Sequence, residues 1–60
     1  MTILAHIRGG VLRLAQVREM LADLPVAVRT DGTDLVVIPD GPIPSVHLMR
    51  AQVAAKLGAE

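Results

Sequence analysis

A chain of 60 residues is long enough for one domain, and folding at this length buries only about 60% of the unfolded surface. Cysteine is absent, which excludes disulfides and thiolate metal sites, and the formal net charge is zero, which argues against a strongly basic nucleic-acid-binding surface. The residues are 52% hydrophobic without any aromatic ring, so we expect part of the apolar surface to stay exposed and to form an interface.

The first predicted element is a β-strand over residues 2–8. Two sets of side chains alternate along it: Ile3, Ala5 and Ile7 on one side, and Leu4, His6 and Arg8 on the other. Gly9-Gly10 follows and is typical of a hairpin loop, because glycine accepts positive φ. This loop predicts a second strand at Val11–Leu14, while the rival interpretation begins a helix directly after the glycines.

A helix is predicted over residues 14–24, because Leu14, Val17, Leu21 and Leu24 recur at the spacing of one helical face. Pro25 ends it, since the residue before a proline is pushed out of the α region.

The next predicted element is a β-hairpin with strands at Val26–Thr30 and Thr33–Ile38 and Asp31-Gly32 at its tip. Asp-Gly between β-branched runs is among the strongest local hairpin signals. A two-residue loop at this point fixes the expected register by three pairs: Thr30 with Thr33, Arg29 with Asp34, and Val28 with Leu35.

A stiff connector over 39–44 carries three prolines and leads to a helix over 46–57, with Ser45 as its N-cap and Gly58 at its end. Two apolar stripes run along this helix: Val46, Met49, Val53 and Leu57 on one face, and Leu48, Ala51 and Ala55 on nearly the opposite face. A helix that is apolar on two faces is usually buried on two faces. We expect the first stripe to pack on the hairpin and the second to contact another chain.

These elements predict one small α+β domain over 1–60, in the order β, an optional second β, α, β, β, α, completed by oligomerisation or docking. No pair of groups has the spacing of a catalytic or metal site, so we expect no enzymatic activity, cofactor, metal or small-molecule substrate. No basic leader precedes an apolar run and no apolar run approaches the ~20 residues of a membrane span, so we expect a cytoplasmic protein without a membrane partner.

Residues 11–32 resemble two bacterial families, the prevent-host-death antitoxins and the swapped-hairpin transition-state regulators. The resemblance is carried by Val11-Leu12-Arg13-Leu14, by the run from Ala15 to Leu21, and by Arg29-Thr30-Asp31-Gly32 at a hairpin turn. The chain lacks the proline before the helix, the Gly-Asp entry to the hairpin and the basic balance of the regulators. The resemblance implies a small dimeric DNA-binding module whose nucleic-acid contacts would come from four arginines: Arg8, Arg13, Arg18 and Arg29.

Two functions follow as expectations. The first is a structural or interaction subunit of a homo-oligomer or a larger assembly, such as a particle or shell. Its partner would be a second copy or a larger protein, and its expected interface residues are Leu48, Ala51, Ala55, Ile3 and Leu4. The alternative is the dimeric DNA-binding regulator. Clustering of the four arginines on one face favours the alternative, whereas their dispersal favours the first function.

Overall fold

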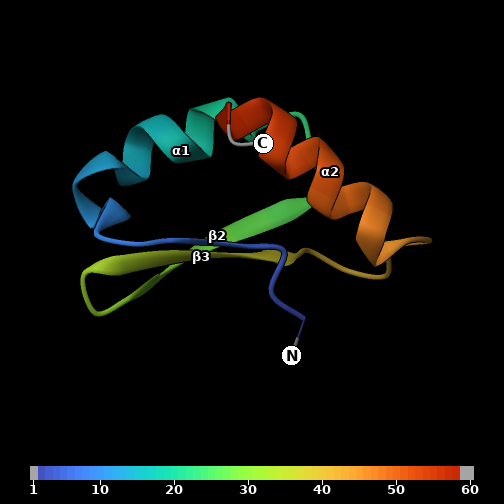
Figure 1. Ribbon diagram of the computed structural model, residues 1–60, viewed down its shortest axis with the longest axis horizontal. Helices are drawn as coiled ribbons and strands as arrows, with labels where there is room; N and C mark the ends of the chain where they lie inside the picture. The colour runs from blue at the N-terminus through green and yellow to red at the C-terminus, as the bar shows by residue number, and fades with distance from the viewer. Residues whose placement is uncertain (1, 59–60) are drawn as a thin grey trace.

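Three antiparallel strands form one sheet in the computed structural model, which describes residues 2–58. The strand order is β1-β3-β2, with β1 at Ala5–Ile7, β2 at Val26–Asp31 and β3 at Asp34–Pro39. Between β1 and β2 lie a 3₁₀ helix, η1 (Gly10–Arg13), and helix α1 (Leu14–Met20), and the last element is helix α2 (Val46–Leu57). Figure 1 shows α1 and α2 on the same side of the sheet, which makes two layers and confirms the predicted α+β class.

The hydrophobic core lies between the sheet and the two helices. Central strand β3 contributes Leu35 and Val37, whose exposed fraction is 0%. The predicted inner faces of both helices meet these residues. Val17 on α1 and Leu21 just after it are buried, as are Met49 and Val53 on α2, with Leu14, Leu24, Val46 and Leu57 packed around them. The helical periodicity therefore predicted the core faces correctly.

Helix α1 is shorter than the sequence predicted. It ends at Met20, and a turn over 21–23 leads to the next strand. Pro25 explains the early end, because a proline ring clashes with the carbonyl of the residue four positions before it, which is Leu21. The chain forms a tighter turn instead, in which the N–H of Leu24 donates to the carbonyl of Leu21, three residues earlier, at 3.0 Å.

The predicted hairpin at Gly9-Gly10 is wrong, and the helical interpretation is correct. β1 pairs with β3, with Ala5 opposite Val37. Gly9 has φ 65° and precedes η1, so the segment after the glycines coils instead of returning as a strand. Gly10 is buried, and a Cβ there would lie 2.6 Å from Cγ2 of Ile7. The two glycines thus turn the chain sharply away from the sheet and allow η1 to sit close to β1.

The β2–β3 hairpin is present, but its register differs by two residues from the predicted one. Asp31 lies opposite Asp34 and Val28 opposite Val37, so the loop is Gly32-Thr33. Gly32 occupies the first loop position with φ 65°, which two-residue hairpin turns require there. A shift of two residues keeps every side chain on its predicted face, because strand side chains alternate with a period of two. The expected pair of Arg29 with Asp34 does not form.

Both predicted ends of α2 are confirmed. Oγ of Ser45 accepts a hydrogen bond from the N–H of Leu48 at 3.2 Å, as an N-cap does, and Gly58 adopts φ 73° at the C-terminal end.

We expect Gly32→Val to lower the free energy of unfolding by about 1–2 kcal/mol, because a side chain at positive φ meets its own backbone. A Cβ at Gly32 would find no other atom within 4 Å, so the loss would come from backbone strain alone. Gly32→Asn is the control, since asparagine tolerates this conformation better and should lose less. Denaturant unfolding measures both, and equal stability of Gly32→Val and wild type would contradict the assigned turn.

Candidate protein interface

The outward face of α2 carries exposed apolar side chains. Leu48 is 59% exposed, and Ala51 and Ala55 are also exposed. Met49 and Val53 on the opposite face of the same helix are buried in the core. The three outward residues predicted for an interface therefore share one accessible face, with the large residue in the first turn and the two small residues after it.

The two N-terminal residues predicted for the interface have different positions. Ile3 is 44% exposed, but Leu4 is 6% exposed and belongs to the core cluster. The N–H of Leu4 also donates to the carbonyl of Val37 at 2.7 Å, which fixes the segment against β3. Leu4 is thus corrected from a surface residue to a core residue, because the strand alternation is lost before β1 begins.

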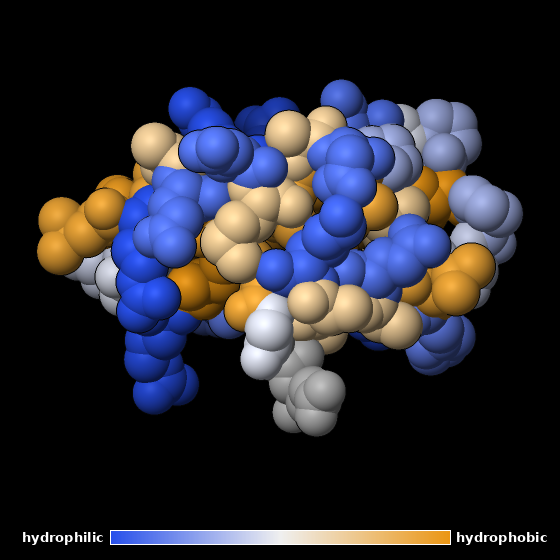
Figure 2. Space-filling view, turned by 90° about the horizontal axis from the view of Figure 1, so that it is seen from above, coloured by the Kyte–Doolittle hydropathy of each residue, from blue (hydrophilic) through white to orange (hydrophobic). Residues whose placement is uncertain are grey.

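Leu12 in η1 is the most exposed large apolar side chain among residues 2–58, at 94%. The sequence left Val11–Leu14 between strand and helix, and neither interpretation selected Leu12 as a surface residue. Figure 2 shows an orange, apolar projection at the left end of the molecule, the end at which η1 lies in Figure 1. The first turn of α2 lies at the right end in Figure 1, so η1 and Leu48 belong to opposite ends.

The four arginines of the DNA-binding alternative are dispersed. Arg13 lines a groove between α1, α2 and β1, whereas Arg18 lines a second groove between α1 and β2. Arg29 lies opposite Val36, and this pair faces away from the helices because the neighbouring pair of Val28 and Val37 faces the core. Arg8 is exposed just after β1. These side chains do not share one face.

The first groove has a volume of about 460 Å³ and an apolar floor that includes Ile7, Val17 and Leu57. Arg13 and Arg50 also line it, together with Gln16 and without any carboxylate. Arg50 is already engaged, since its Nε and Nη2 donate to the carbonyl of Ile3 at 3.4 and 3.2 Å. That guanidinium mainly ties α2 to the segment before β1.

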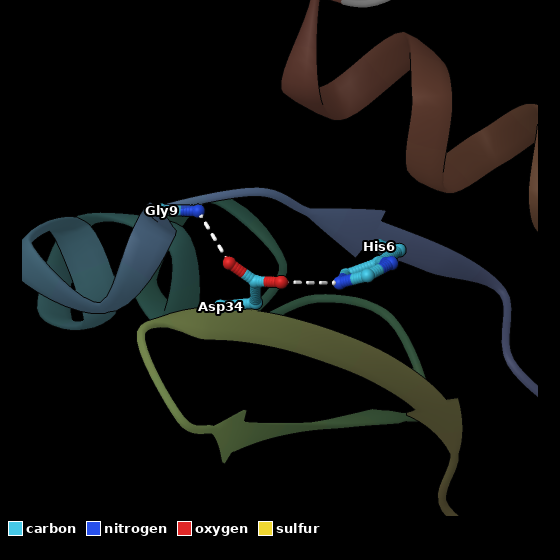
Figure 3. A network of polar contacts seen from close by, with 3 residues as sticks. All are labelled: His6, Gly9 and Asp34. Carbon is cyan, nitrogen blue, oxygen red and sulfur yellow. Dashed lines mark hydrogen bonds and ion pairs between the residues drawn. The ribbon is translucent and has the colours of Figure 1, made fainter.

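A polar network joins β1, β3 and the turn between β1 and η1 (Figure 3). Oδ1 of Asp34 accepts the N–H of Gly9 at 2.7 Å, and Oδ2 lies 2.9 Å from Nε2 of His6. The Gly9 N–H, followed by the His6 ring, holds the pKa of Asp34 below its ordinary value. Figure 3 shows the His6 ring on the side of β1 away from α2. The network therefore closes the turn before η1 on the outer face of the sheet.

A second surface contact joins α2 to the turn after α1. Nζ of Lys56 lies 2.6 Å from Oδ2 of Asp23, and this hydrogen bond holds the pKa of Asp23 below its ordinary value. Both side chains are well exposed, so water screens the pair, and such pairs contribute little to stability.

The chemistry available to these residues is limited. No hydrogen bond in the described part of the chain links His6 to a hydroxyl group that could serve as a nucleophile. Residues 2–58 contain no group of three His, Asp or Glu side chains that could hold a metal ion. Over the same residues, neither helix has the length and apolar character needed to cross a membrane.

Comparison of the sequence with protein-family models, curated proteins and solved structures found no match.

The Asp34 network should make stability depend on pH in the acid range. Because the pKa of Asp34 is lowered on folding, its contribution is present above the ordinary aspartate pKa of about 3.9 and is lost as pH falls through the folded value. Asp34→Asn should be less stable than wild type at neutral pH, and the difference should shrink on acidification. Thermal unfolding at several pH values across this range measures the stability difference between the two proteins.

Asp40→Asn is the matched control for this experiment. Asp40 is exposed, and its carboxylate accepts no hydrogen bond from the described residues, so its replacement removes one negative charge without removing a contact. An Asp34→Asn protein with the same acid transition as wild type would contradict a stabilising role for the network.

Proposed function

We propose that the chain is a non-enzymatic interaction subunit that works within a homo-oligomer or a larger protein assembly, such as a particle or shell. The observation that carries this proposal is the outward face of α2, where Leu48, Ala51 and Ala55 are exposed although the opposite face already fills the core. Small residues let a partner backbone come close, and Leu48 supplies the anchor.

The size of the core supports the need for a partner. The buried cluster consists of seven residues, and one layer of helices covers only one side of the sheet. Domains of this length are marginally stable and often gain stability from oligomerisation when they have neither disulfides nor metals. Association through an exposed apolar face would supply part of that stability.

The DNA-binding alternative receives less support. Its clearest expectation was a cluster of Arg8, Arg13, Arg18 and Arg29, and these residues lie on different faces. Nucleic-acid affinity depends on several cations that contact phosphates together. The dispersed arrangement favours a protein partner, and a native mass measurement with and without duplex DNA separates the two functions.

Leu48→Asp tests the α2 face. Burial of a leucine side chain contributes about 1.5–3 kcal/mol, so its loss should weaken association by about ten- to a hundredfold. Position 48 lies in the first turn of α2, where an acidic side chain interacts favourably with the helix dipole, so the helix should remain intact. Sedimentation measures the association state, and circular dichroism measures the helix content.

His47→Asp is the matched control, because it places the same charge in the same helical turn but to one side of the Leu48 face. We expect this variant to assemble as wild type does. A folded Leu48→Asp protein that also assembles as wild type does would move the interface away from α2.

The melting temperature should also rise with protein concentration if the partner is a second copy, as mass action requires. A monomeric mass with a concentration-independent melt would contradict self-association and leave docking onto a different protein.

A further inference from the structure

Strand β2 is an edge strand with an unpaired outer side. It lies next to β3 only, and its six residues make it twice as long as the other edge strand, β1, which has three. An unpaired edge presents a row of N–H and C=O groups that another strand can pair with.

The outward-facing backbone groups can be assigned from three contacts. Pro39 has no N–H, and its partner Val26 donates its own N–H to the carbonyl of Leu24 at 2.8 Å. The carbonyl of Val37, which lies opposite Val28, accepts from Leu4 on the β1 side. The pairs Val26–Pro39 and Val28–Val37 are therefore the non-hydrogen-bonded pairs of the ladder between β2 and β3. Because the pattern alternates in an antiparallel ladder, the backbone groups of Val28 and Thr30 point away from β3.

The first half of the β2 edge also lacks the usual protection against pairing, whereas Arg29 and Asp31 lie in its second half. Natural edge strands are blocked by proline, charged residues, bulges or short length. β2 contains no proline, and its first three residues, Val26, Ala27 and Val28, carry no charge. No hydrogen bond from the described residues reaches the outward groups of Val28 and Thr30.

We propose that β2 pairs with β2 of a second copy, antiparallel and about a two-fold axis centred on Val28, which joins the two sheets into one of six strands. In this register Val28 lies opposite Val28 of the second copy, Val26 opposite Thr30, and Ala27 opposite Arg29. The outward groups of Val28 and Thr30 then form the new ladder. The second copy supplies the partner chemistry, because each residue meets a compatible one.

Strand length and charge decide between this register and its neighbours. Centring the axis on Ala27 would place Thr30 opposite Leu24 of the second copy, which lies outside β2 and shortens the ladder. A two-fold axis keeps the helices of both copies on the same side of the joined sheet only when it is centred on a residue. Centring it on Arg29 would place two arginines directly opposite, which is destabilising. Centring it on Thr30 would shorten the apolar contact, because Val28 would then lie opposite Gly32 of the second copy. The Val28 register avoids both and covers Ala27 with the stem of Arg29.

A groove on the helix side of the edge supports this contact. It has a volume of about 330 Å³ and is lined by α1, the turn after it and β2, including Leu21, Leu24, Val26 and Val28. Val28 is half-buried and packs against the core, so pairing would place apolar side chains of both copies beside this groove.

This inference specifies one partner for the proposed interaction subunit, but it does not depend on the α2 face. Failure of the two proposals is therefore distinguishable. Loss of self-association in a β2 variant, with no change in Leu48→Asp, would assign the contact to β2, and the converse result would assign it to α2.

Single-cysteine variants test the register, because the chain has no cysteine of its own. Directly opposed Cα atoms in a hydrogen-bonded antiparallel pair lie about 5.5 Å apart, within the range that a disulfide spans. Under equilibrating redox conditions, Val28→Cys should form a disulfide-linked dimer almost completely at micromolar protein, since pairing holds the thiols at an effective concentration on the order of millimolar.

Thr30→Cys is the control for this experiment, because the two Thr30 positions would lie about 14 Å apart along the paired strands. Thr30 is more exposed than Val28, so random collision would favour the control. Cross-linking of Ala27→Cys, Arg29→Cys or Thr30→Cys in place of Val28→Cys would overturn the Val28 register, and cross-linking of none of the four would overturn edge pairing.

Thr30→Pro tests the pairing without a cross-link. Proline is tolerated where the N–H faces away from the sheet, but it removes one donor from each copy. Losing two hydrogen bonds should raise the dimer Kd by about thirtyfold, whereas Thr30→Val, which keeps the N–H, should leave it near the wild-type value. Circular dichroism confirms that the monomer stays folded. A folded Thr30→Pro protein that dimerises like Thr30→Val, or a wild type that stays monomeric, would overturn the proposal.

Discussion

The central position of β3 is the constraint on which the rest of the fold depends. β3 pairs on both sides, with β1 and with β2, and its Leu35 and Val37 are fully buried. The same core cluster also takes residues from β1, β2 and both helices. Among residues 2–58, only β3 has a partner strand on both sides, so β1 and β2 are edge strands. The helices cover one face of the sheet, but they do not pair with these edges.

The sequence predicts this arrangement well wherever the signal is local. The helical spacing of Leu14, Val17 and Leu21 identifies the inner face of α1, and Ser45 and Gly58 identify the ends of α2. Both are properties of a few neighbouring residues. The alternation in β2 and β3 likewise identifies the buried side of the hairpin, even though the predicted loop was displaced.

The wrong sequence-based predictions arise where residues far apart in the chain compete with near neighbours for the same partner. The sequence pairs Asp34 with Arg29, but Asp34 binds the N–H of Gly9 and the ring of His6, which are 25 and 28 residues away. The local pattern at Gly9-Gly10 predicts a hairpin loop. In the structure, however, β1 pairs with β3, which follows η1, α1 and β2 in the chain. Leu4 was assigned to the surface for the same reason, because its burial depends on Val37. The candidate α2 face, by contrast, could be found from the sequence, since it needs only helical periodicity.

Charged side chains on the outer face of the sheet disfavour apolar docking there, and this limits how an assembly could grow. That face carries Arg29, Asp31 and the Asp34 network among its apolar residues, whereas the exposed large apolar side chains among the described residues lie before β1, in η1 and on α2. Pairing of β2 with itself is isologous, and the closed dimer uses the β2 edge of each copy while the short β1 edges stay unpaired. Growth beyond a dimer would then require a second surface, such as the α2 face on the helix layer of each copy.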